Sequence, residues 1–115
     1  MPTIKKVRKT PEKPVKIGRP RKLRTIRNEP GIRQFSPRGR RGRPGYRELK
    51  LEELEAIRLS DFMGLNQRDA AAFMKVSQQT FSRVLRSGRK SLAEALVKGE
   101  IIKVRGGDFK IEKFA

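Results

Sequence analysis

Apolar and polar residues alternate with a helical period in residues 49–63, and this pattern predicts the first helix of the chain. Three glutamates fall in its first turns, where the partial positive charge of a helix N-terminus favours acidic side chains. Gly64 follows at the position where glycine commonly ends a helix. The apolar residues expected to face the core are Leu51, Leu54, Ile57 and Phe62, and the three glutamates are Glu52, Glu53 and Glu55.

Capping residues predict two further helices. Asn66 can cap a short helix around residues 70–74, because Asp69 stands three residues later in a near capping-box arrangement. Ser77 can cap a third helix, which ends before Gly99. The order of these caps along the chain predicts an array of three helices.

The third helix is predicted to be continuous, because its leucine spacing carries on across Gly88. One side of this helix is apolar and the other is polar and cationic. The expected buried stripe is Phe81, Val84, Leu85, Leu92 and Leu96, and the expected solvent stripe is Gln78, Gln79, Ser82, Arg83, Arg86 and Lys90.

The period changes after the third helix. Residues 101–105 and 108–112 each alternate between apolar and polar side chains, and Gly106 and Gly107 separate them. Two alternating segments around a glycine pair are typical of a β-hairpin. We therefore expect a small hairpin within residues 100–115, which must pack on the helices or on a second copy of itself, since a lone hairpin is marginal in water.

The first 48 residues differ in composition from the rest of the chain. They carry 17 of the 30 basic residues, 3 of the 12 acidic residues and all seven prolines. Such a segment has too few apolar side chains to offset the entropy lost on folding. The predicted fold is therefore mostly α: an extended or disordered basic arm at 1–48, a three-helix helix-turn-helix domain at 49–99 and the hairpin at 100–115.

Composition excludes several kinds of chemistry. Cysteine and histidine are both absent. Disulfides, Cys/His zinc sites and histidine general bases are excluded with them, and we predict neither catalytic residues nor a metal or cofactor. The longest apolar run, residues 70–74, is too short for a membrane span. A net charge of +18 makes a polyanion the expected partner, and we expect a cytoplasmic protein associated with the nucleoid.

Residues 67–86 match the pattern of a helix-turn-helix. Ala71 supplies the small residue needed where two helices cross, and Val76 fills the turn. The alternative is an ordinary helical hairpin with a solvated cationic face, but residues 70–93 contain no acid, whereas a surface selected for solubility mixes both signs. Lys75 stands where this turn commonly carries glycine. The positions expected to contact DNA bases are Gln78, Gln79, Ser82, Arg83 and Arg86.

The order of motifs resembles that of a known protein family. The motifs are Gly18-Arg-Pro-Arg-Lys22, Phe35-Ser-Pro37, residues 51–61, Gly64-Leu65, the helix-turn-helix, residues 95–99 and Gly106-Gly107. The chain resembles small bacterial and archaeal proteins of unknown function that are predicted to bind DNA, with a helix-turn-helix similar to region four of primary-type sigma factors. Some of these proteins carry a further domain resembling iron-molybdenum-cofactor proteins. The chain ends before that domain, so the resemblance implies no cofactor here.

The arm contains two segments that resemble the core of an AT-hook, in which arginines lie along a narrow minor groove. The alternatives are a basic tail held only by counterion release, or an ordered brace against the helices for residues 18–22. The AT-hook-like segments are Gly18-Arg19-Pro20 and Arg41-Gly42-Arg43-Pro44. The residues expected to contact phosphates or the minor groove are Arg19, Arg21, Lys22, Arg41, Arg43, Lys75, Arg89 and Lys90.

The sequence favours a sequence-specific double-stranded-DNA-binding regulator of transcription. Two alternatives stay open: a general accessory protein that binds RNA or the nucleoid, and a sigma-like factor that contacts RNA polymerase. Many helix-turn-helix proteins pair across two half-sites, so a second copy of the chain is a further candidate partner. We expect no enzyme activity and no membrane partner. The acids of the first helix are expected to form a solvated face that pairs with the basic arm rather than a divalent-ion site.

Overall fold

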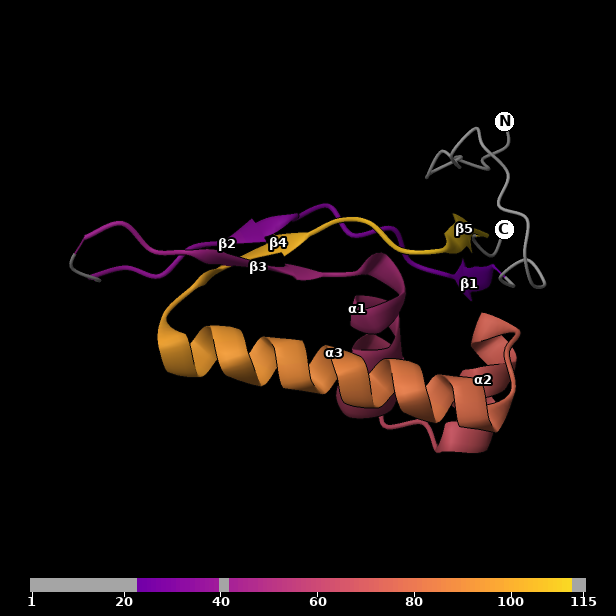
Figure 1. The fold of residues 1–115 in the computed structure, drawn as a ribbon. Helices are drawn as coiled ribbons and strands as arrows, with labels where there is room; N and C mark the ends of the chain where they lie inside the picture. The colour runs from indigo at the N-terminus through magenta and orange to yellow at the C-terminus, as the bar shows by residue number, and fades with distance from the viewer. Residues whose placement is uncertain (1–22, 40–41, 113–115) are drawn as a thin grey trace, which may run out of the picture.

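The computed structural model describes residues 23–39 and 42–112, which form three α-helices, one π-helix and five short strands. The longest helix runs along the molecule, with the second helix at its N-terminal end and the strands along one side (Figure 1). The elements are β1 (Arg24–Ile26), β2 (Gln34–Phe35), β3 (Tyr46–Leu49), α1 (Leu51–Ile57), the π-helix η1 (Arg58–Phe62), α2 (Gln67–Met74), α3 (Gln78–Lys98), β4 (Ile101–Val104) and β5 (Phe109–Ile111).

The three predicted helices are confirmed, and two of them have the predicted side-chain caps. The Asn66 side chain accepts a hydrogen bond of 2.8 Å from the Asp69 backbone N–H, and Ser77 Oγ accepts one of 3.0 Å from that of Thr80. These bonds satisfy donors that have no partner within the first turn of a helix. α3 runs without a break to Gly99, which adopts the left-handed conformation with a φ of 67°.

Gly88 lies where α3 approaches α1 closely. A methyl group on Gly88 would lie 2.9 Å from the Cβ atom of Glu53, 3.2 Å from its backbone oxygen and 3.3 Å from Cδ1 of Ile57. Glycine in a helix interior costs about 1 kcal/mol relative to alanine. The close approach of the two helices is therefore the physical reason for a glycine in the middle of α3.

Buried apolar residues form two clusters, and Ile57 packs against both of them. The first cluster joins the strands to α1 and α3, whereas the second is made only of helical residues. The first contains Ile26, Leu49, Leu51, Ala95, Ile102, Val104, Phe109 and Ile111. The second contains Ala56, Leu59, Ala70, Ala71, Met74, Phe81, Val84 and Leu85.

The predicted C-terminal hairpin is wrong, because β4 and β5 pair with earlier strands and not with each other. β4 lies between β2 and β3, antiparallel to β2 and parallel to β3, while β5 pairs in parallel with β1. Gly106 and Gly107 have φ angles of 83° and 109°, and the Gly106 carbonyl accepts a hydrogen bond from the Leu51 backbone N–H. The glycine pair therefore carries the chain from one sheet to the other.

Parts of the predicted basic arm belong to the folded structure, since residues 24–26, 34–35 and 46–49 form strands that pair with β4 and β5. The domain boundary predicted after residue 48 falls inside β3. The physical reason is that β4 and β5 offer backbone hydrogen bonds to these segments, so a few apolar residues suffice to anchor them. Ile26 and Thr25 are fully buried. Residues 1–22 of the predicted arm lie outside the described residues.

Two residues expected in the core are exposed. Phe62 is 83% exposed because the first helix continues as a π-helix, whose wider turn changes the direction of the following side chains. Leu96 is 70% exposed, since the strands cover the side of α3 on which Ala95 lies. The helical period predicted the elements correctly but placed these two side chains on the wrong side.

The α1 glutamates are buried, so the expected solvated acidic face is also wrong. Glu55 is 2% exposed and accepts hydrogen bonds from the Arg27 backbone N–H at 2.9 Å and from the Arg58 guanidinium at 2.8 Å. Glu53 accepts a hydrogen bond of 2.6 Å from Ser87 Oγ. Burial raises the pKa of Glu52 above its ordinary value. These carboxylates thus join α1 to the N-terminal strands and to α3.

Gly88→Ala is expected to destabilise the protein by ~1–2 kcal/mol, because the added methyl group overpacks the contact with Glu53. Helix propensity alone predicts a gain of ~1 kcal/mol, so the two effects differ in sign. Urea unfolding followed by circular dichroism measures the change. Ala93→Gly, at an exposed position of the same helix, is the control for propensity. A more stable Gly88→Ala variant would show that the two helices separate easily.

Glu52→Gln is expected to raise the thermal unfolding midpoint at pH 7 by roughly 5 °C, or about 1 kcal/mol. Since the folded-state pKa of Glu52 is raised, the folded protein holds this proton to a higher pH than the unfolded chain. Stability therefore falls as pH rises above the ordinary glutamate value, and the neutral amide avoids that loss. The advantage should shrink as the pH is lowered towards that value.

Calorimetric scans at a series of pH values, from pH 7 down to the ordinary pKa of glutamate, test this expectation. Glu48→Gln, which removes an exposed carboxylate from β3, is the matched control and should show no such gain. A Glu52→Gln variant that is less stable than the wild type at pH 7 would mean that the charge itself stabilises the fold.

Candidate nucleic-acid interface

A tight turn joins α2 to α3. Lys75 adopts the left-handed conformation, with φ 57° and ψ 45°, and its backbone N–H donates to the carbonyl of Ala72 at 3.1 Å. For a residue other than glycine, this conformation costs about 1 kcal/mol. Val76 packs against the helical cluster, and Ala71 is buried where the helices meet. The turn is therefore tight, and Lys75 adopts in it the left-handed conformation that glycine commonly supplies.

The first half of α3 exposes a polar and cationic face. Arg83 and Arg86 are exposed and make no hydrogen bond or ion pair with the part of the chain that the structure describes. The buried stripe of the same helix lies on the opposite side and includes Phe81, Val84 and Leu85. The structure thus brings together the five predicted base-contacting positions: Gln78, Gln79, Arg83 and Arg86, which are exposed, and Ser82, which is half-buried.

Three of the predicted phosphate-contacting cations already have acidic partners. Arg89 forms an ion pair of 2.6 Å with Asp61, and this hydrogen bond holds the pKa of Asp61 below its ordinary value. Lys75 pairs with Glu112 at 3.1 Å. Lys90 pairs with Glu94 at 3.3 Å. The flanks of the face therefore differ from its centre, where the arginines are not neutralised.

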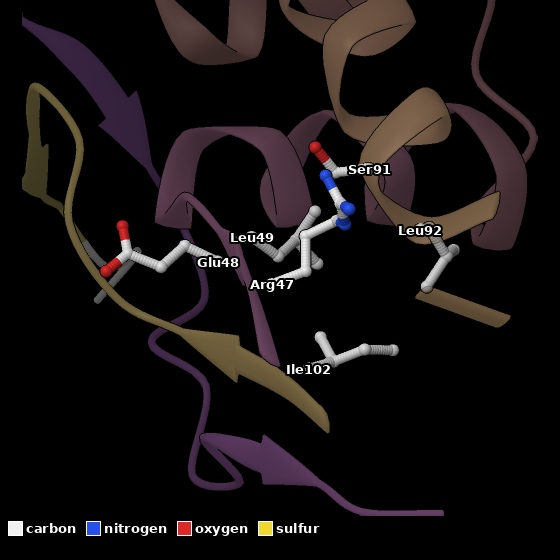
Figure 2. Close-up of a pocket in the computed structure, with 6 residues that line it drawn as sticks. All are labelled: Arg47, Glu48, Leu49, Ser91, Leu92 and Ile102. Atoms are coloured by element: carbon white, nitrogen blue, oxygen red, sulfur yellow. The ribbon is translucent and has the colours of Figure 1, made fainter. Parts of the chain in front are cut away.

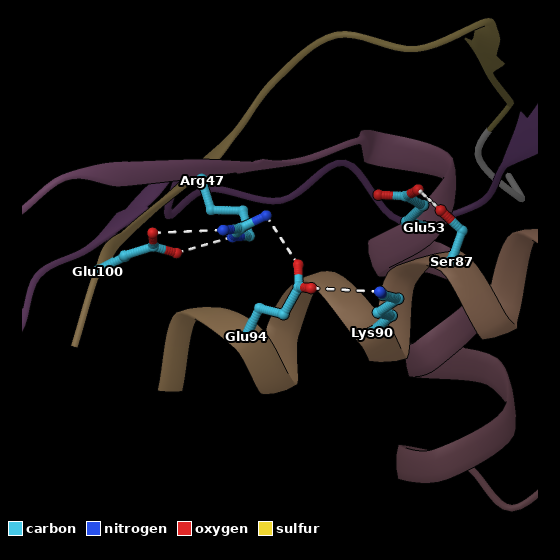
Figure 3. A network of polar contacts seen from close by, with 6 residues as sticks. All are labelled: Arg47, Glu53, Ser87, Lys90, Glu94 and Glu100. Carbon is cyan, nitrogen blue, oxygen red and sulfur yellow. Dashed lines mark hydrogen bonds and ion pairs between the residues drawn. The ribbon is translucent and has the colours of Figure 1, made fainter. Parts of the chain in front are cut away.

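A polar network fastens the C-terminal half of α3 to β3 (Figure 3). Arg47 donates to Glu100 at 2.7 Å and pairs with Glu94 at 2.8 Å. The hydrogen bond from Lys90 and the nearby charge of Arg47 hold the pKa of Glu94 below its ordinary value. Glu94 and Glu100 thus neutralise cations beside the C-terminal half of α3.

α3 and the sheet pack against each other without a cavity between them. Figure 2 shows Arg47 and Leu49 of β3 beside Leu92 of α3, with Ile102 of β4 facing them. The gap between these side chains has no room for a water molecule. This region is a packing contact and not a binding pocket.

The AT-hook-like segment that includes Arg43 lies in the loop that joins β2 to β3. Arg43 is exposed and Gly42 has a φ of 79°, so the backbone bends there in a way that suits glycine. Strand pairing anchors both ends of this loop on β4. Of the other predicted arm contacts, Arg19, Arg21, Lys22 and Arg41 lie outside the described residues.

A polar cleft of about 180 Å³ runs along one flank of α3. Sequence reasoning singled out Arg83 there but missed Lys50 and Arg24. Helical spacing does not reveal the parallel pairing of β1 with β5. This pairing joins segments that are distant in the sequence and brings Arg24 close to α3. The cleft is lined by Arg24, Lys50, Glu52, Glu53, Thr80, Arg83, Val84 and Ser87.

The described residues contain neither a cluster of metal ligands nor a helix that could span a membrane. Residues 23–39 and 42–112 contain no group of three or more His, Cys, Asp or Glu side chains placed to hold a metal ion. Within the same residues, no helix is both long enough and apolar enough to cross a bilayer.

The chain is similar to UPF0251 proteins of several prokaryotes. UPF0251 protein Teth39_0655 of Thermoanaerobacter pseudethanolicus is 45% identical over 96 residues, which cover 83% of this chain and 81% of that protein. UPF0251 protein TTE1845 of Caldanaerobacter subterraneus is 46% identical over 96 residues, with the same coverage of 83% and 81%. A UPF0251 protein of Methanothermobacter thermautotrophicus is 45% identical over 93 residues, covering 81% of this chain but 49% of the longer relative.

No solved structure matches the chain. Residues 14–112 match the sequence profile of one family, in agreement with the resemblance noted from the motifs. The chain belongs to the family described as "Protein of unknown function DUF134".

Proposed function

We propose that the protein binds double-stranded DNA with sequence preference and regulates transcription. The observation that carries this proposal is the cationic face on the first half of α3, which directly follows the tight turn from α2. Two helices joined in this way resemble a helix-turn-helix, in which the N-terminal residues of the second helix meet base edges in the major groove. In this proposal α3 is the recognition helix and α2 packs across it.

The side chains on this face suit base recognition. An α-helix with its side chains is about 10–12 Å wide and fits a major groove of about 12 Å. Arginine pairs with the two acceptors of guanine, and glutamine pairs with adenine. The proposed base-contacting residues are Gln78, Gln79, Ser82, Arg83 and Arg86.

The flanking cations suit the phosphate backbone. The pairs of Lys75, Arg89 and Lys90 with acids are all solvent-exposed, and such pairs contribute only about 0–1 kcal/mol. A phosphate can therefore replace the acidic partner at little cost. We propose that Arg43, which is exposed in the loop after β2, contacts phosphates or the minor groove. The net charge of +18 supports attraction to DNA and a location at the nucleoid.

A binding selection from a random duplex library at about 0.15 M salt tests the proposal, because screening suppresses weak long-range attraction at that concentration. We expect an enriched motif. A palindromic motif with half-sites about 34 Å apart would indicate a dimer, and a single short motif a monomer. Binding without any motif, or a preference for RNA, would instead favour a general accessory protein. Capture of RNA polymerase after nuclease treatment would favour the sigma-like alternative.

Arg86→Ala and Gln79→Ala are each expected to relax the preference for one base pair of the selected motif, at a cost of about 1–3 kcal/mol. The measurement is competition between the selected duplex and single-base variants of it. Lys103→Ala is the matched control, since Lys103 lies on β4 between the buried Ile102 and Val104 and so on the sheet face away from the core. Equal losses on selected and random duplexes would exclude base contacts by the two residues.

A further inference from the structure

The cleft beside α3 lies between the recognition face and the N-terminal strands. Successive residues of an α-helix are rotated by about 100°, so Arg83 is turned by about 40° from Gln79 towards Ser87. Ser87 and Thr80 line the cleft, whereas Gln79 and Arg86 do not. Arg83 is therefore the one proposed base-contacting residue that also faces the cleft.

Cations from three separate elements meet at this cleft. Arg24 comes from β1, Lys50 from the residue before α1, and Arg83 from α3. Lys50 and Arg83 are exposed, and neither side chain forms an ion pair with the residues that the structure describes. These two side chains are thus available to an anion, while Arg24 belongs to the wall of the cleft.

The two carboxylates in the cleft wall are directed to partners within the protein. Glu53 accepts hydrogen bonds from Ser87 Oγ at 2.6 Å and from the Lys50 backbone N–H at 3.0 Å. Glu52 accepts one from the Asp108 backbone N–H at 3.4 Å. Both side chains are 5% exposed, and burial raises the pKa of Glu52, which disfavours its negative charge. The exposed charge at the mouth of the cleft is therefore positive.

The size and position of the cleft suit one phosphate group. A volume of about 180 Å³ holds several waters, each of which occupies about 30 Å³ in the liquid. The sugar-phosphate backbone borders the major groove on both sides of an inserted helix, and contacts to phosphates fix the register of the protein on the duplex. The cleft lies on the flank of α3, where such a backbone passes.

We propose that this cleft binds one backbone phosphate of the duplex through the side chains of Lys50 and Arg83. The inference rests on the proposed function and changes it in one respect. Arg83 contacts a phosphate that positions the helix, and the base contacts belong to Gln78, Gln79, Ser82 and Arg86. Lys50, which no sequence motif includes, becomes part of the DNA-binding surface.

Salt titrations of Lys50→Ala, Arg83→Ala and the double variant test this assignment on the selected duplex and on a random one. Each single variant should bind both duplexes about tenfold more weakly, with the slope of log K against log salt reduced by about 0.9. Because both residues bind the same phosphate, the double variant should lose less than the two single losses combined. Lys103→Ala removes the same charge on the sheet and should leave the slope nearly unchanged.

Neutral methylphosphonates placed one at a time along the duplex locate the phosphate. The wild type should lose affinity at one position on the border of the motif, and both single variants should be insensitive to that same substitution. Circular dichroism checks that the variants are folded. A change of base preference in Arg83→Ala, or a Lys50→Ala variant that behaves like Lys103→Ala, would overturn the phosphate assignment while leaving duplex binding intact. A wild type that binds no duplex would overturn the proposed function itself.

Discussion

Parallel pairing between the N-terminal and C-terminal strands is the constraint on which the rest of the structure depends. Parallel strands need a long crossover connection, and here the connection from β3 to β4 is the whole helical unit. The pairing therefore fixes the start of α1 and the end of α3 relative to each other. β1 and β5 add a second parallel pair, which brings Arg27 to Glu55. The helices are thus held at both ends by strands, and the face of α3 is presented on a supported element.

Close contact between α1 and α3 is the second constraint, and it explains the unusual chemistry of α1. Gly88 lets α3 lie against Glu53, and the backbone of α1 leaves no space for a larger residue. Carboxylates buried along α1 need hydrogen-bond donors, because an unpaired buried charge is costly. Glu53 accepts hydrogen bonds from the Ser87 hydroxyl and the Lys50 backbone N–H. Glu55 accepts them from the Arg27 backbone N–H and the Arg58 guanidinium. The acidic residues in the N-terminal turns of α1 therefore hold α1 against its neighbours through buried hydrogen bonds, and they do not form a solvated surface.

Local signals predicted the helical part of the fold well, and non-local pairing explains what they missed. The caps at Asn66 and Ser77 and the continuous leucine spacing depend on neighbouring residues, so the sequence showed them directly. The glycine pair predicted a hairpin, but β4 and β5 form their backbone hydrogen bonds with strands that lie 55 to 85 residues away along the chain. The same limitation applies to the candidate site. The face of α3 follows from helical spacing, whereas Lys50 and Arg24 join the cleft only through tertiary structure.

In the proposed function, the overall charge and the face of α3 have different roles: the charge attracts DNA, and the face of α3 recognises its sequence. Glu94 pairs with Lys90 and Arg47, and Asp61 pairs with Arg89, but within the described residues no acid forms an ion pair with Arg83 or Arg86. An overall charge of +18 attracts any polyanion and carries no sequence information. Sequence preference comes from side chains held in one geometry at the base edges, and from the sequence-dependent shape of the duplex. On α3 those side chains lie on a helix fixed by two apolar clusters and two parallel strand pairs, so the rigid part of the molecule supports the part that would have to discriminate between sequences.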